Sequence, residues 1–149
     1  MGSYDVVLTN VVGSTTSATA AVSLNIPVTI LNAPASATVN PGKSVSFSVS
    51  ATGTGPITYQ WRKNGTAISG ATAGTYTIAS ASTASAASYD VLVKNVVGSV
   101  TSAPATLTLN TPVTITTQPS AVAANPFASV TLRVAATGTG PLTYQWRKA

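Results

Sequence analysis

The chain repeats itself after 85 residues, and this repeat limits the folds that it can form. Ser3-Tyr4-Asp5-Val6 returns as Ser88-Tyr89-Asp90-Val91, and the stretch Thr58 to Lys63 returns at 143–148. When residues 3–63 are laid on residues 88–148, 37 of the 61 positions are identical and no gap is needed. A regular internal repeat indicates a tandem array in which each copy builds the same structural unit.

Within the repeat, apolar and polar residues alternate with the period of two that is typical of half-buried β-strands. This alternation covers residues 45–51, 57–62, 75–78, 89–95 and 105–109. Turn residues separate these stretches, and one of the turns is Asn64-Gly65, the pair preferred in a type I′ hairpin. No stretch carries the apolar stripe of an amphipathic helix. Seven or so short strands in each repeat predict an all-β sandwich of two sheets.

Three stretches of the repeat, namely Val45 to Gly53, Tyr59 to Gly65 and Ser88 to Ser99, resemble a known family. They are similar to the bacterial immunoglobulin-like repeats of the intermediate (I-set) type, and the resemblance covers nearly the whole chain. It implies tandem immunoglobulin-like β-sandwiches, with Trp61 as the tryptophan of strand C. It also implies that Tyr89, two residues before Val91, forms a tyrosine corner. Ser85 and Ala87 replace the acidic residue and the glycine that usually precede this tyrosine.

The chain has no cysteine, although many members of this family join their two sheets by a disulfide. Val49 and Val91 stand where the family often has its cysteines. A disulfide typically contributes about 2–4 kcal/mol, and burying a valine contributes about 1.5–3 kcal/mol. We therefore expect a contact between the two valines, under Trp61, to offset much of the loss. The expected core residues are Val49, Trp61, Tyr76, Ile78, Tyr89 and Val91.

The repeat predicts one complete domain flanked by two partial ones. Residues 1–26 match strands F and G, residues 27–111 form the complete domain, and residues 112–149 match strands A, B and C. Three arrangements fit this division: pairing of the partial domains of neighbouring molecules, a window from a longer repeat protein, or an arbitrary segment with frayed ends. The first is a head-to-tail contact that propagates into a filament. The candidate pairing residues are Tyr4, Val6, Val134, Tyr144 and Trp146.

The side-chain inventory argues against catalysis. The chain has no histidine, cysteine or glutamate, and its two acids, Asp5 and Asp90, occupy the same repeat position. General acid–base chemistry, a catalytic triad and a metal site each need groups that are missing here, so we expect neither an enzyme nor a cofactor nor a metal. The expected role of Asp90 is a cross-strand ion pair with Arg62.

Charge and hydropathy restrict the partners. The net charge is +5, but it comes from only seven bases, which is thin for a phosphate-binding surface, so no nucleic acid is expected. No apolar run reaches the length of a membrane span, and no membrane insertion is expected. The first residues lack the features of a signal peptide.

Two functions remain. The first is a structural subunit or segment of an extracellular fibre or cell-surface stalk, whose main partner is a further copy of itself. The second is an adhesin or decoration module that binds a glycan or a protein through its loops. Sparse charge, no cysteine and outward-facing Ser and Thr favour an exposed, oxidation-insensitive polymer. Concentration-dependent polymerisation would distinguish the first function from the second.

Overall fold

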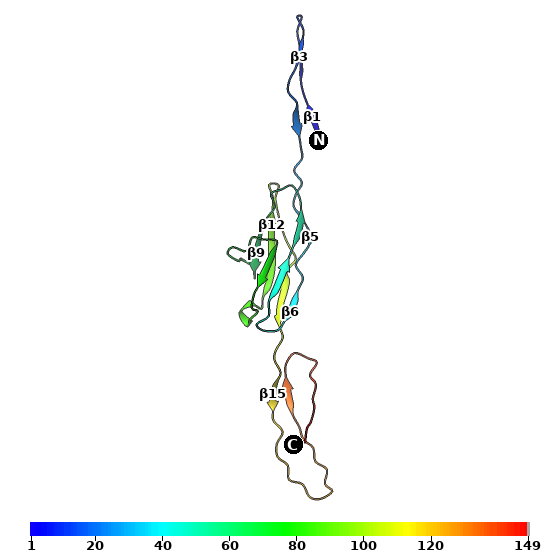
Figure 1. The fold of residues 1–149 in the computed structure, drawn as a ribbon, viewed down its shortest axis with the longest axis vertical. Coiled ribbons are helices and arrows are strands. Elements are labelled where there is room, and N and C mark those ends of the chain that lie inside the picture. Colours follow the sequence, from blue (N-terminus) through cyan, green and yellow to red (C-terminus); the bar gives the residue numbers. More distant parts are fainter. Residues whose placement is uncertain (149) are drawn as a thin grey trace.

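The computed structural model describes residues 1–148 and has an elongated shape, with a β-sandwich between two slender terminal segments (Figure 1). Ala149, the last residue of the expected third unit, lies outside the described residues. The sandwich contains strands β5 to β14 and a single turn of 3₁₀-helix, η1 (Thr83–Ser85). Its strands are β5 (Thr29–Asn32), β6 (Ala37–Val39), β7 (Val45–Ser48), β8 (Ser50–Thr52), β9 (Thr58–Lys63), β10 (Thr66–Ala67), β11 (Thr75–Ile78), β12 (Ser88–Lys94), β13 (Ser99–Thr101) and β14 (Ala105–Leu109).

Two layers form the sandwich. The first is a sheet in the order β10-β9-β12-β14-β6, in which β13 also pairs with β12. The second contains the antiparallel pairs β11-β7 and β8-β5. β5 pairs with β8 in the second layer, whereas β6 pairs in parallel with β14 in the first. The chain therefore passes from one layer to the other between β5 and β6. This topology confirms the all-β sandwich that the alternation predicts and the immunoglobulin-like arrangement that the resemblance implies.

One expected strand is divided in the structure. The alternation predicts a single strand over residues 45–51, but β7 ends at Ser48 and β8 begins at Ser50. The two halves pair with different partners, β11 and β5, and between them the amide of Val49 donates a hydrogen bond to the carbonyl oxygen of Gly74 (2.9 Å). The division therefore lets one stretch of chain join two neighbours, which a period-two pattern does not reveal.

The core contains an aromatic cluster that spans both layers. The rings of Phe47 and Tyr89 are stacked with centroids 5.0 Å apart, and Trp61 and Tyr76 lie at tilted angles around them. The indole N–H of Trp61 donates to the carbonyl oxygen of Ala73 (2.9 Å), so burial leaves no unsatisfied donor on this ring. The largest fully buried side chains are Trp61, Tyr89, Phe47, Leu107, Val91 and Val93.

The two local features expected from single residues are present. Asn64 and Gly65 both have positive φ, 48° and 80°, and they join β9 to β10 in the register Lys63↔Thr66, as a type I′ turn requires. The phenol of Tyr89 donates to the carbonyl oxygen of Ser85 (2.8 Å), which is the tyrosine corner. Because this bond uses the main chain of residue 85, it does not depend on the side chain found there.

The terminal segments form only part of the strands that the repeat predicts. Residues 1–25, here called the N-terminal hairpin, contain β1 (Gly2–Tyr4), β2 (Val7–Thr9), β3 (Ser14–Thr16) and β4 (Ala20–Val22), paired β1-β4 and β2-β3. Residues 112–148, the C-terminal segment, contain β15 (Thr114–Thr117) and β16 (Ala135–Thr137), which pair as β5 and β8 do. Residues 143–148 form no strand within this described segment. Their copy in the sandwich, β9, pairs with β12, and a strand needs such a partner to form.

Candidate functional site

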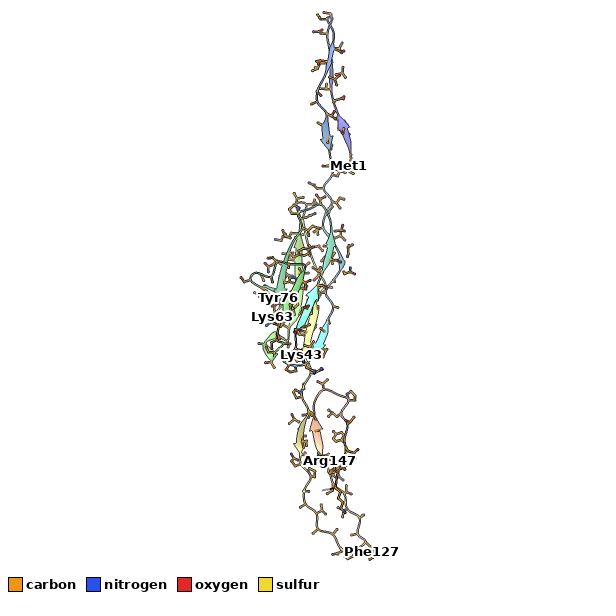
Figure 2. All side chains as sticks on the ribbon, in the orientation of Figure 1. Met1, Lys43, Lys63, Tyr76, Phe127 and Arg147 are labelled. Carbon is orange, nitrogen blue, oxygen red and sulfur yellow. The ribbon has the colours of Figure 1, made fainter. Side chains whose placement is uncertain are left out.

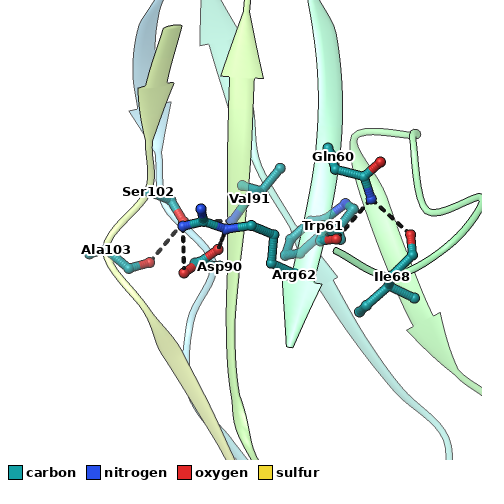
Figure 3. A network of polar contacts seen from close by, with 8 residues as sticks. All are labelled: Gln60, Trp61, Arg62, Ile68, Asp90, Val91, Ser102 and Ala103. Atoms are coloured by element: carbon teal, nitrogen blue, oxygen red, sulfur yellow. Dashed lines mark hydrogen bonds and ion pairs between the residues drawn. The ribbon is translucent and has the colours of Figure 1, made fainter. Parts of the chain in front are cut away.

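The acidic group of the sandwich is engaged in a structural contact. Asp90 lies directly opposite Arg62 on adjacent strands, and its carboxylate accepts hydrogen bonds from Nε (2.5 Å) and Nη2 (3.0 Å) of the guanidinium (Figure 3). This confirms the predicted cross-strand pair. The hydrogen bond to Asp90 raises the pKa of Arg62 above its ordinary value. These two hydrogen bonds hold the carboxylate against the guanidinium across β9 and β12.

The described residues contain no further acidic or metal-ligating cluster. Within residues 1–148, no three His, Cys, Asp or Glu side chains come together. Nor do those residues include a helix whose length and apolar character would suit a membrane crossing.

The six expected core residues all lie in or against the sandwich interior. Trp61, Tyr89 and Val91 are buried, while Val49, Tyr76 and Ile78 are half-buried and pack against the same cluster. Sequence reasoning missed Phe47, Val93, Ala105 and Leu107, which are also buried. Phe47 could have been found from its spacing of two from both Val45 and Val49, and Val93 from its spacing of two from Val91.

The C-terminal segment carries an apolar groove of about 540 Å³. Its lining includes Val113, Ile115, Val134, Leu142, Tyr144 and Trp146. The copies of these residues 85 positions earlier are Val28, Ile30, Val49, Ile57, Tyr59 and Trp61, and every one belongs to the core of the sandwich or packs against it. The groove is therefore the uncovered counterpart, on the C-terminal segment, of the sandwich core. Trp146 is 49% exposed, whereas Trp61 is 0% exposed.

The N-terminal hairpin presents the opposite half of such a core. Tyr4 is 62% exposed, although its copy Tyr89 is 1% exposed, and the same contrast holds for its neighbours along the hairpin. The exposed apolar residues are Tyr4, Val6, Leu8 and Val22, and their buried copies are Tyr89, Val91, Val93 and Leu107. The side chain of Ser17 accepts from the amide of Val6 (3.1 Å), as Ser102 does from Val91 (3.1 Å), so the hairpin already has the local geometry of the complete domain.

The five candidate pairing residues do not meet within one molecule. Tyr4 and Val6 lie on the N-terminal hairpin, and Val134, Tyr144 and Trp146 lie in the groove of the C-terminal segment, at the other end of the sandwich (Figure 1). Figure 2 shows that side chains along both terminal segments project into solvent, with Arg147 on one of them. Any contact between the two faces therefore has to join separate molecules.

A set of hydrogen bonds ties each repeat to the next. The amide of Ile26 donates to Oγ1 of Thr54 (2.7 Å), and the amide of Thr54 donates to the carbonyl oxygen of Ile26 (3.0 Å). Asn95 adds two bonds, because its side-chain amide donates to the carbonyl oxygens of Ile26 (2.8 Å) and Thr54 (3.1 Å). Thr111 and Thr139 repeat the first two bonds at 2.6 and 2.9 Å. Two of the four hydrogen bonds of the first joint thus recur at the other end of the sandwich.

A glycine makes the close approach at each joint possible. Gly53 has a φ of 149°, and a Cβ there would lie 2.9 Å from the carbonyl oxygen of Pro27. Gly138 has a φ of 154°, and a Cβ there would lie 3.0 Å from Cα of Val113. Only glycine therefore fits between the loop and the linker at either position.

Comparison with known proteins gives a family match over part of the chain and several partial likenesses. Residues 27–95 match the immunoglobulin domain family. A decoration protein of Escherichia phage T5 is 47% identical over 60 residues, which make up 40% of this chain and 37% of that protein. The chain thus spans little more than a third of this relative.

Solved structures with several domains in a row share the fold. An I-band fragment from titin has a TM-score of 0.57 and 25% identity, and the likeness covers 63% of this chain and 36% of the fragment. The four N-terminal immunoglobulin domains of Dscam1 have a TM-score of 0.53 and 30% identity, covering 72% of this chain and 27% of theirs. Domains of this type therefore occur as tandem arrays in proteins whose structures resemble this one.

Proposed function

Since residues 27–95 match the immunoglobulin domain family, we propose that this chain is a structural element of an extracellular fibre or surface stalk, in which copies join head to tail by strand complementation. The N-terminal hairpin of one molecule fills the groove on the C-terminal segment of the next. The observation that carries this proposal is the matched exposure of the two faces. Each presents, in the same order and spacing, one half of the core that the sandwich buries.

The register of the sandwich defines the register of the proposed contact. In the sandwich, β12 pairs with β9 so that Val91 lies opposite Trp61. The corresponding pair between molecules is Val6 opposite Trp146. Completion of a sheet by a strand from another chain is an established mode of recognition, and an unpaired strand edge is its usual template. Residues 143–148 would gain in this way the partner strand that they lack.

Burial supplies the free energy for the contact, and an incomplete core limits it. Each fully buried Val or Leu contributes about 1.5–3 kcal/mol. The composite domain, however, contains no copy of strand β11, so the contributions of Tyr76 and Ile78 are missing. Two absent large side chains forgo about 3–6 kcal/mol. The joint between molecules is therefore weaker than the sandwich itself.

Deletion of residues 2–25 tests the proposal, because it removes the hairpin and leaves the strands of the sandwich. The intact chain is expected to sediment as a series of oligomers whose size grows with concentration, and the shortened chain as a monomer. An intact chain that remains monomeric at the highest soluble concentration contradicts the proposal. So does a shortened chain that polymerises equally well.

The similarity to a phage decoration protein favours a second function, that of a module bound to the surface of a large particle. Such a module would recognise a protein or a glycan through its loops and would have no need to associate with itself. The same sedimentation experiment separates the two functions. A monomer at all concentrations that is retained on an intact particle or cell surface supports the decoration role and excludes the polymer.

A further inference from the structure

The turn at the tip of the N-terminal hairpin is a copy of the turn that locks the joint inside the chain. Oδ1 of Asn10 accepts from the amides of Val12 (2.8 Å) and Gly13 (3.0 Å), as Oδ1 of Asn95 accepts from those of Val97 (3.0 Å) and Gly98 (3.2 Å). The side-chain amide of Asn95 also donates two hydrogen bonds across the joint. Within residues 1–148, that of Asn10 donates none.

Carbonyl oxygens that match the acceptors of Asn95, and that could accept from the side-chain amide of Asn10, lie at the far end of the sandwich. Asn95 donates to the carbonyl oxygens of Ile26 and Thr54, and the copies of these two residues are Thr111 and Thr139. Thr111 and Thr139 already hold each other by two hydrogen bonds of 2.6 and 2.9 Å, and no asparagine side chain among residues 1–148 donates to them. The two carbonyl oxygens that would accept from an asparagine are therefore already held in place by the Thr111–Thr139 hydrogen bonds.

We propose that the Thr111–Thr139 pair is a docking site for the Asn10 turn of a second copy of this chain. The side-chain amide of Asn10 donates one hydrogen bond to the carbonyl oxygen of Thr111 and one to that of Thr139. This inference rests on the proposed head-to-tail function and identifies the polar contact that sets its register. The joint between molecules then reproduces the joint within the chain, so successive sandwiches follow one another at the same spacing throughout.

The variant Asn10→Asp tests the docking in the full chain. Aspartate has the same shape and keeps the oxygen that holds the turn, but it cannot donate, and it places a negative charge opposite two carbonyl oxygens. Loss of two hydrogen bonds is expected to lower the association constant about tenfold or more, as measured by sedimentation equilibrium. The amide resonances of Val12 and Gly13 report whether the turn itself is intact.

Asn95→Asp is the matched control, because it makes the same change in the same turn of the sandwich. It is expected to remove the two hydrogen bonds to the carbonyl oxygens of Ile26 and Thr54 and to leave the association constant within about twofold of the wild type, since Asn95 faces the internal joint. If Asn10→Asp associates as tightly as the wild type, or if Asn95→Asp weakens association equally, the docking is wrong while the head-to-tail function stands. A wild-type chain that stays monomeric overturns both.

Discussion

At the scale of single residues, the same amino acid has different surroundings in the two copies of the repeat. Trp61 is enclosed by the aromatic cluster of the sandwich, whereas Trp146 lines an open groove. The two side chains are chemically identical, and their neighbours along the chain are identical as well. The energetic role of each tryptophan is therefore decided by the strands that cover it.

The substitution Trp61→Ala is expected to lower the free energy of unfolding of the sandwich by about 3–5 kcal/mol, because it leaves a large cavity in the core. For a domain of ordinary stability, about 5–15 kcal/mol, this removes a large share of the total. Urea denaturation followed by circular dichroism measures the change. Trp146→Ala is the control and is expected to leave the midpoint nearly unchanged at low protein concentration. Equal effects of the two substitutions would contradict the assignment of the core.

Tyr89 illustrates how a buried polar side chain is accommodated. Burial raises the pKa of its phenol, and the nearby Tyr76 adds to this shift. The hydrogen bond to Ser85 satisfies the protonated form in the interior. The neutral phenol is therefore the form that the folded state prefers. The corresponding stabilisation persists below the ordinary pKa of tyrosine, about 10, and is lost as the pH rises above it.

At the scale of the structural elements, strand length follows from pairing rather than from local pattern. β12 runs without a break from Ser88 to Lys94 because it has partners on both sides, while its copy in the N-terminal hairpin is divided into β1 and β2. Most of the positions in these two copies carry the same residue, yet one copy forms a single strand and the other forms two short ones. Cross-strand hydrogen bonds, supplied by distant parts of the chain, account for the difference.

The linkers between the repeats are held by threonine side chains, Thr54 at one joint and Thr139 at the other. Thr54→Val keeps the shape of the side chain but removes the oxygen that accepts from the amide of Ile26. Hydrogen exchange of that amide is expected to accelerate about five- to tenfold, the usual effect of losing one hydrogen bond. Thr139→Val should act on the amide of Thr111 in the same way and leave Ile26 unchanged. If neither amide responds, the threonine contacts do not hold the linkers.

At the scale of the whole molecule, the proposed contact between copies carries an ion pair. Asp90 lies opposite Arg62 in the sandwich, and the corresponding residues of the two terminal faces are Asp5 and Arg147. An exposed pair of this kind contributes at most about 1 kcal/mol, but like charges at the same distance repel. Charge reversal is thus a sensitive probe of which residues face each other between molecules.

The variants Asp5→Arg and Arg147→Asp are each expected to associate severalfold more weakly than the wild type, because each places like charges in contact. An equimolar mixture of the two variants forms alternating chains in which every contact again joins opposite charges. Its association is expected to return to about the wild-type level at low salt, and the differences should shrink as salt screens the charges. If the mixture is no tighter than either variant alone, the predicted register is wrong.

Features that depend on neighbouring residues and on the repeat could be predicted from the amino-acid sequence alone. Alternation predicted the strands, and Asn64-Gly65 predicted its turn. The outward position of Asp90, between two inward residues of its strand, predicted its pair with Arg62. These patterns involve residues that are close in the chain or that recur at a fixed distance, so they can be recognised in the sequence.

Which stretches pair and which faces remain open could be learned only from the folded arrangement of the strands. The break at Val49, the position of Phe47 beside Tyr89 and the two bonds from Asn95 to Ile26 and Thr54 all join residues that are far apart in the chain. A strand's own pattern states which side is apolar, but not which strand will cover it. For that physical reason Trp61 and Trp146, alike in sequence, lie in a closed core and in an open groove.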